Sequence, residues 1–68
     1  MEKYKIATEY IKLDQFLKWV GAVGQGSDAK MIILEGLIRV NGEVEVRRGK
    51  KLRPGDVVDY NGVQYEVE

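Results

Sequence analysis

Cysteine and histidine are both missing from the 68 residues of this sequence. Their absence removes disulfides, thiolate nucleophiles, imidazole bases and the usual soft metal ligands. The remaining carboxylates include Asp14, Asp56 and Asp59, which are not spaced as a ligand pair or as an acid and base pair. We therefore expect a protein that is not an enzyme and that carries no metal and no cofactor.

Long hydrophobic runs are missing as well. The longest is "MIIL", residues 31–34, which is too short to cross a membrane, and "MEKYKIATEY" lacks the apolar core of a signal peptide. The glycine-rich "GAVGQGSDAK" lacks the Gly-Lys-Ser/Thr ending of a nucleotide-binding loop. With 44% hydrophobic residues the chain can build one small core. We expect a single cytoplasmic domain of residues 1–68, a monomer that binds neither a membrane nor a small-molecule substrate.

The net charge is zero, because eleven Lys and Arg balance eleven Asp and Glu. The charges are nevertheless segregated: residues 12–53 carry nine bases against five acids, whereas residues 54–68 carry four acids and no base. The densest segment is "RRGKKLR", residues 47–53, with five bases and no acid. Such a run can contact the phosphates of a nucleic acid. The alternative is an ordinary solvated loop, and charge alone does not decide between the two.

The first third of the chain changes its periodicity. Alternating polar and apolar residues predict a strand over about 3–10. The period then becomes that of a helix that ends at Gly21 and has an apolar stripe of Leu13, Phe16, Leu17 and Val20.

A second helix is expected from about Asp28 to Glu35, after a glycine-rich loop. Ser27 is a favourable N-cap for it, and Gly36 is placed to end it. Its inward stripe consists of Ala29, Ile32 and Ile33. Because Met31 and Leu34 lie off that stripe, we expect this helix to be covered on more than one side.

The remainder of the sequence predicts strands at 37–40, 43–46, 57–60 and 63–67. The segment "RPGD", residues 53–56, has Pro and Gly at the central positions that suit a type II turn. A two-residue loop at Asn61-Gly62 places the apolar residues of both flanking strands on one face.

The other Asn-Gly pair, Asn41-Gly42, predicts a different loop. A two-residue loop there would set Val40 opposite Glu43 and mix apolar and acidic side chains on one face. A three-residue bulged loop instead places Ile38 opposite Val44 and keeps Arg39 on the polar face. We predict this odd register, which a direct pair between Val40 and Glu43 would contradict.

Together these elements predict an α+β fold with two short helices packed on a small, mostly antiparallel β-sheet. Polar side chains of the helices and of the first hairpin can join the basic run in one surface. The candidate nucleic-acid-binding residues are Lys12, Gln15, Lys18, Ser27, Lys30, Arg39, Arg47, Arg48, Lys50, Lys51 and Arg53.

Large apolar residues off the helical stripes leave two interpretations open. Trp19 either packs at the core or its edge, or stacks on an unpaired base beside the lysines. Met31, Leu34 and Trp19 could also form an exposed patch for a protein partner, which would make the chain an interaction adaptor.

Three segments resemble a known family: "KLDQFL", "GSDAKMIILEGLIRVNGE" and "RRGKKLRPGDVV". They look like the S4-type RNA-binding domain, also called the αL motif, over about residues 11–60, and most closely like short stand-alone bacterial members sometimes called YaaA-like. The resemblance implies binding of structured RNA, above all ribosomal RNA or the ribosome, on a surface formed by the two helices and the hairpin. It also implies a ribosome-associated or assembly factor without a catalytic domain.

The resemblance assigns some positions one by one. Lys12 stands where the family commonly has Arg, Ser27 would cap the second helix, and Lys30 and Arg39 lie on the matching surface. Asp28 departs from the pattern, since many members have Arg after that Ser. This departure shifts the expected phosphate contacts toward Lys30 and residues 47–53.

Overall fold

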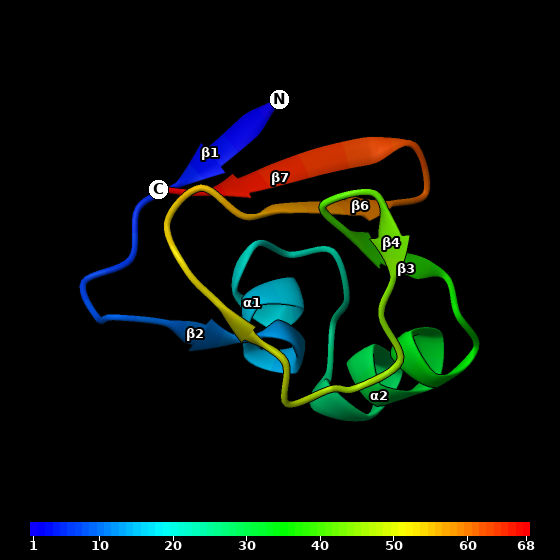
Figure 1. Cartoon of the computed structure of the whole chain (residues 1–68). Coiled ribbons are helices and arrows are strands. Elements are labelled where there is room, and N and C mark those ends of the chain that lie inside the picture. Colours follow the sequence, from blue (N-terminus) through cyan, green and yellow to red (C-terminus); the bar gives the residue numbers. More distant parts are fainter.

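The computed structural model describes all residues, 1–68 (Figure 1). Its elements, in chain order, are β1 (Glu2–Tyr4), β2 (Ile11–Lys12), α1 (Leu13–Trp19), α2 (Gly26–Leu34), β3 (Ile38–Val40), β4 (Glu43–Val44), β5 (Lys51–Leu52), β6 (Val57–Tyr60) and β7 (Val63–Val67).

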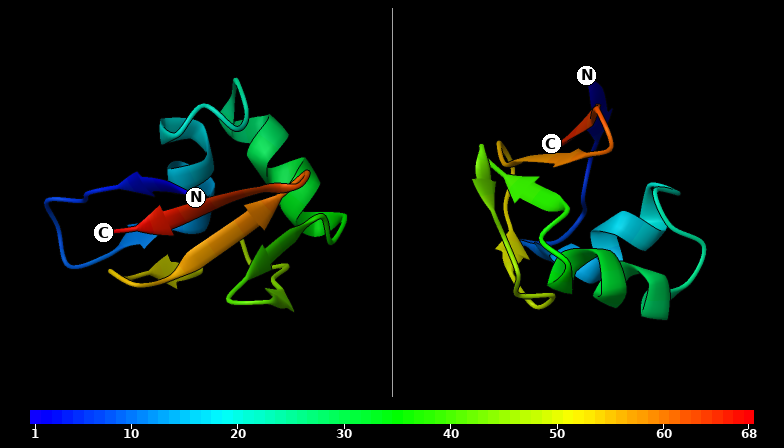
Figure 2. Two further views of the ribbon diagram at one scale, coloured as in Figure 1. Left: turned by 90° about the horizontal axis from the view of Figure 1, so that it is seen from above. Right: turned by 90° about the vertical axis from the view of Figure 1, so that its right-hand side faces the viewer.

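The main sheet has five strands in the order β1-β7-β6-β3-β4. Its pairs are antiparallel except β1 and β7, which are parallel. A separate antiparallel ladder joins β2 to β5, and the two helices lie together on one side of the main sheet (Figures 1 and 2). The architecture confirms the predicted α+β class with two helices on a mostly antiparallel sheet.

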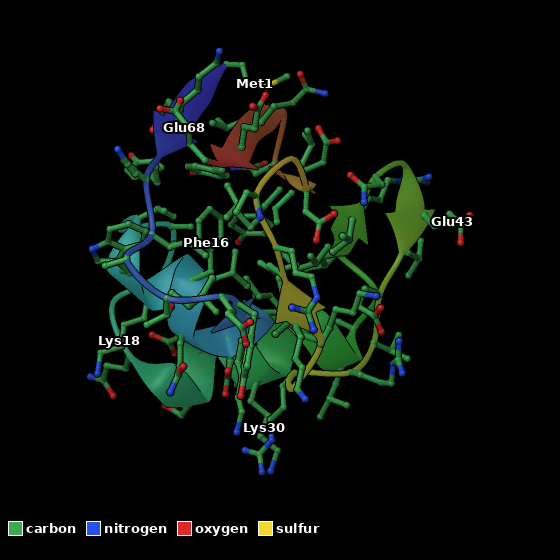
Figure 3. The ribbon with its side chains drawn as sticks, turned by 60° about the vertical axis from the view of Figure 1, so that its left-hand side comes forward. Met1, Phe16, Lys18, Lys30, Glu43 and Glu68 are labelled. Atoms are coloured by element: carbon green, nitrogen blue, oxygen red, sulfur yellow. The ribbon has the colours of Figure 1, made fainter.

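The core lies between the helices and the main sheet. Phe16 points into this space (Figure 3), together with the rest of the α1 stripe. The fully or almost fully buried side chains are Leu13, Phe16, Leu17, Ala29, Ile33, Ile38, Val40, Leu52, Val58, Tyr65 and Val67. No polar or charged side chain is buried among them. Each large apolar side chain removed from water contributes about 1.5–3 kcal/mol, so this apolar cluster is the main stabilising feature of a small domain.

Both helices end in the same way. Gly21 follows α1 with φ +80°, and Gly36 follows α2 with φ +77°, as the sequence predicts. The N–H of Ala22 donates to the carbonyl of Leu17, and that of Leu37 donates to the carbonyl of Ile32. These are Schellman motifs, in which only glycine adopts the left-handed position without steric cost.

The prediction of a strand over residues 3–10 is wrong. Only Glu2–Tyr4 and Ile11–Lys12 are extended and paired, and they belong to different sheets. The alternation arises because Tyr4 and Ile6 are partly buried against the core while their neighbours are exposed. The pairing of β2 with β5 was not predicted, since two residues are too few to show a period.

The predicted start of α2 is also wrong. The helix begins at Gly26, its N-cap is Gln25, and no side chain caps it. Ser27 therefore lies inside the first turn. The residues from Gly24 to Asp28 are exposed, so water can satisfy the free N–H groups and a side-chain cap is not required.

The register predicted for the first hairpin is contradicted. Val40 pairs with Glu43 and Arg39 pairs with Val44. Asn41 has φ 52° and Gly42 has φ 86°, the backbone of a tight two-residue turn whose twist matches the strands. The prediction assumed that a buried face enforces the register. However, β4 is a two-residue edge strand with both side chains exposed, so its acidic and apolar residues can take either side.

The second hairpin and the turn before it follow the sequence. Tyr60 pairs with Val63 and Val58 with Tyr65, as a two-residue loop requires. At the turn over 53–56, the N–H of Asp56 donates to the carbonyl of Arg53 at 3.0 Å, and Gly55 has φ +101°, which is typical of type II. None of the helices has the length and apolar character needed to span a bilayer.

Candidate functional site

The ladder between β2 and β5 places two lysines directly opposite each other. Ile11 pairs with Leu52, and Lys12 pairs with Lys51. Because successive side chains of a strand point to opposite faces and Leu52 is fully buried, Lys12 and Lys51 share the face that points to solvent. Like charges in directly opposed positions are destabilising. This pair is therefore a local cost that a bound anion would relieve.

The basic run is attached to the start of α1 through its backbone. The N–H of Leu13 donates to the carbonyl of Lys50 at 2.8 Å, and the N–H of Asp14 donates to that of Arg48 at 3.1 Å. The first N–H groups of a helix have no partner within the helix. Here two of them hold the loop in place, which brings Arg48 and Lys50 next to Lys12.

The same loop forms an open depression, which we call the basic hollow, with a volume of about 550 Å³. Its lining consists of Gly49 and four cationic residues, Arg47, Lys50, Lys51 and Arg53, and contains no carboxylate. No apolar residue lines it, so it offers charge and hydrogen-bond donors rather than an enclosed apolar pocket. Such a lining suits phosphate groups.

Tyr10 is a residue of this site that the sequence did not indicate. The Nζ of Lys51 lies 4.9 Å from the centroid of the Tyr10 ring, and the Cζ of Arg53 lies 5.7 Å from it. Both distances are in the range of cation–π interactions. The ring thus restrains two cations of the basic hollow. The sequence offered no signal for this role, because Tyr10 matched the apolar positions of the predicted first strand.

Only one cation of the chain is paired with an acid. Arg47 donates its Nε–H to a carboxylate oxygen of Glu45 at 3.1 Å. The hydrogen bond raises the pKa of Arg47 and, from the other side, lowers the pKa of Glu45. The other basic side chains of residues 12–53 have no carboxylate within salt-bridge distance. Eleven acids are available in the chain, so the absence of other pairs reflects the segregation of charge.

The remaining candidate residues are exposed but separate from the basic hollow. Gln15 and Lys18 lie on α1, and Ser27 and Lys30 lie on α2. Lys18 and Lys30 point to solvent on the helical side of the molecule (Figure 3). No hydrogen bond, ion pair or shared depression joins these four to the basic run; Gln15 is next to it only through the adjacent Asp14 backbone.

Residues 4–68 match the family described as the S4 domain. The chain belongs to the S4 domain family. This confirms the resemblance found in "KLDQFL" and the two later segments, and the match extends to the N-terminal strand and the acidic end.

Curated relatives of this S4 domain are of similar length. The chain is 46% identical over 57 residues to RlbA, a probable ribosome maturation protein of Bacillus subtilis. This match covers 84% of this chain and 80% of RlbA. The chain is 34% identical over 58 residues to a putative RNA-binding protein, YbcJ, of Escherichia coli, across 85% and 83% of the two chains.

Solved structures are similar in fold. The solution structure of YbcJ, described as revealing an αL motif involved in RNA binding, superimposes with a TM-score of 0.75 at 31% identity, across 98% of this chain and 86% of that one. The 30S ribosomal protein S4e of Thermoplasma acidophilum superimposes with a TM-score of 0.66 at 21% identity, across 87% of this chain and 31% of that one. The second similarity is one of fold alone.

Arg39 of this S4 domain lies on the outer face of the main sheet, as predicted. It stands between the buried Ile38 and Val40, and its Cα partner on β6 is Asp59. Its guanidinium donates to the carbonyl of Gly42 at 3.3 Å. The three-residue loop was therefore not needed to expose Arg39, because alternation along β3 is sufficient.

Three large apolar side chains of this S4 domain are exposed. Trp19 is 51% exposed, Met31 is 58% exposed and Leu34 is 61% exposed. The expected cover on a second side of α2 is therefore absent from the chain itself. Trp19 packs at the edge of the core, where its ring meets Tyr4 and Phe16, and the rest of the ring faces solvent.

The acidic end of this S4 domain forms β6 and β7 of the main sheet. β7 pairs with β1, so residues 63–67 lie beside the N-terminal strand. Glu68 lies at the opposite end of the molecule from Lys30 (Figure 3). The zero net charge therefore conceals a segregation of charge along the sequence.

Proposed function

We propose that this protein binds structured RNA, with ribosomal RNA as the principal target, through the face that carries Lys12, Lys51 and the basic hollow. One observation carries the proposal, the convergence of five cations on one surface: Lys12, Arg47, Lys50, Lys51 and Arg53. Only Arg47 is paired with an acid, and Lys12 and Lys51 are held opposite each other. The opposed lysines cost the free protein stability, and a bound polyanion would relieve their repulsion. The S4 domain membership supports this proposal, as do the similarities to RlbA, a probable ribosome maturation protein, and to YbcJ, whose αL motif is involved in RNA binding.

The contacts would be made mainly with phosphates and with the shape of the RNA. Side chains cannot read the deep and narrow major groove of double-stranded RNA, and proteins recognise such RNA mostly through its shape and its backbone. The basic hollow is open and lacks apolar walls, which suits a backbone that passes over it. The protein then acts in the cytoplasm as a monomeric, ribosome-associated maturation factor that binds RNA and catalyses no reaction on it.

The salt dependence of RNA binding tests this proposal. Four to six phosphate contacts give a slope of log affinity against log salt of roughly −3 to −5. We would measure anisotropy of a labelled ribosomal RNA hairpin between low and physiological salt. Lys51→Gln should reduce the magnitude of the slope by about 1. Lys3→Gln, an equal charge change on β1, should leave it unchanged, and binding that ignores salt would contradict the proposal.

A second candidate is a protein-interaction adaptor, which the exposure of Met31 and Leu34 favours. These residues are neighbours at i and i+3 on α2, so they form one small apolar strip. Substitution of both by lysine separates the two functions. Loss of ribosome association with full affinity for purified RNA would assign that association to the strip, whereas retention of both would leave RNA binding as the function.

A further inference from the structure

A second, smaller depression lies next to the exposed ring of Trp19. Its volume is about 250 Å³, and it is lined by Lys5, Ile6, Ala7, Thr8, Ile11 and Trp19. We call it the Trp19 groove. Small-molecule sites usually enclose roughly 300–1,000 Å³ and surround their ligand. This groove is smaller and open, so it suits one flat aromatic group that remains attached to something larger.

The indole ring of Trp19 is held in one orientation before any ligand arrives. It makes edge contacts with Tyr4, with ring centroids 5.6 Å apart at 63°, and with Phe16, at 6.2 Å and 65°. These contacts restrain the ring but leave 51% of the side chain exposed. A restrained aromatic ring with an open surface is the arrangement on which nucleobases stack in RNA-binding proteins.

The groove and the basic surface are connected by three consecutive residues. Tyr10 contacts Lys51 and Arg53, Ile11 lines the groove, and Lys12 stands opposite Lys51. Lys5 is part of the groove lining and no acid is. A strand of RNA whose phosphates lie on the basic surface can therefore reach the groove along residues 10–12, past the exposed Glu9, and the lining of the groove itself contains no carboxylate.

We propose that the Trp19 groove receives one unpaired nucleobase of the bound RNA, which stacks on the indole ring. This inference rests on the proposed function, because the basic surface must hold the RNA backbone. It adds a preference that phosphate contacts cannot provide: RNA with a bulged or flipped base beside a helix binds more tightly than a continuous duplex.

The intrinsic fluorescence of the protein provides a direct test, since Trp19 is its only tryptophan. The probes are a fully paired RNA hairpin and the same hairpin with a single bulged adenine. We expect the bulged hairpin to quench the fluorescence and to bind roughly tenfold more tightly, a typical effect of one stacked base. Equal binding of both hairpins without quenching would overturn the groove proposal and leave the proposed function intact. Failure of both hairpins to bind would overturn the two together.

Two variants locate the effect. Trp19→Leu should abolish the preference for the bulge while it keeps the affinity for the paired hairpin. Because this variant loses contacts with Tyr4 and Phe16, Ala7→Glu is the second one: Ala7 is exposed and outside the core, and the new carboxylate would fill the groove. Leu34→Ala, at an exposed apolar position of α2, is the control and should retain the preference.

Quenching by intact ribosomal subunits but not by their extracted RNA would overturn the proposal and assign the groove to a protein.

Discussion

Lys12 and Lys51 stand directly opposite each other on the ladder between β2 and β5, on the face that points to solvent. Neither has an acidic partner. The neighbouring pair on the ladder, Ile11 and Leu52, faces the core. The same short ladder therefore contributes an apolar pair to stability and a repulsive pair to the surface. This arrangement is typical of a binding site, where residues that bind a ligand lower the stability of the free protein locally.

This relationship predicts that removal of one lysine stabilises the free protein. Lys51→Gln should raise the free energy of unfolding by about 0.2–1 kcal/mol, since it removes the opposed like charge. The gain should shrink in high salt, which screens the repulsion. Thermal unfolding at low and high salt measures both effects. Because Lys51 also contacts the ring of Tyr10, Lys12→Gln is the cleaner companion variant. A loss of stability in both variants would show that the pair is not repulsive.

Tyr10 should act on binding through the two cations that it restrains. Tyr10→Phe keeps the ring and should bind RNA as the original protein does. Tyr10→Leu keeps apolar bulk but loses cation–π contacts worth about 0.5–1 kcal/mol at exposed sites. We therefore expect about a two- to fivefold lower affinity for Tyr10→Leu, measured by anisotropy at low salt. Equal weakening in the Phe and Leu variants would point to the hydroxyl group instead.

Glu45 should restrict the cationic surface by holding Arg47. Glu45→Gln should raise RNA affinity by about threefold at low salt, since one negative charge near the phosphates is removed and the guanidinium is freed. Glu43→Gln removes the same charge from β4 without freeing a guanidinium and should give a smaller gain. Salt titrations of the three proteins separate the effects, and unchanged affinity in Glu45→Gln would place Arg47 outside the RNA contact.

The same pair gives a pH dependence of known sign. The hydrogen bonds from Arg47 lower the pKa of Glu45 in the folded protein. The stabilisation is therefore complete above the ordinary glutamate pKa of about 4.5 and is lost as the pH falls through the lower pKa of the folded protein. Unfolding of the original protein and of Glu45→Gln should differ at neutral pH and converge in acid; a difference that grows in acid would contradict the sign.

The two Asn-Gly turns predict unequal costs for the same substitution. Asn41 accepts a hydrogen bond from the N–H of Val57 at 2.9 Å and donates one to Asp56 at 3.0 Å. Asn61 has the same backbone conformation but makes no side-chain hydrogen bond. Glycine tolerates both backbones, so Asn41→Gly should cost about 1–3 kcal/mol more than Asn61→Gly. Chemical denaturation measures both variants, and equal costs would show that the contacts of Asn41 are not stabilising.

The sequence by itself determined the class of fold, both helices, their glycine ends, the second hairpin and the RNA-binding family. These features depend on the spacing of apolar residues and on turn residues, and both involve residues that lie close together in the sequence. Leu13, Phe16 and Leu17 are buried as their spacing predicts. The segregation of charge was also legible in the order of residues alone.

Only the tertiary structure decided which cations converge. Lys12 meets Lys51 across a ladder too short to have a period, and Tyr10 reaches Lys51 and Arg53 from a segment assigned to the wrong strand. The Asn41 turn took the register that the sequence argued against, because β4 lies at the sheet edge, where no core selects one face. The period of apolar residues predicts burial only along a regular helix or strand. It therefore gives no information on short ladders, sheet edges and loops, which are the parts that form this surface.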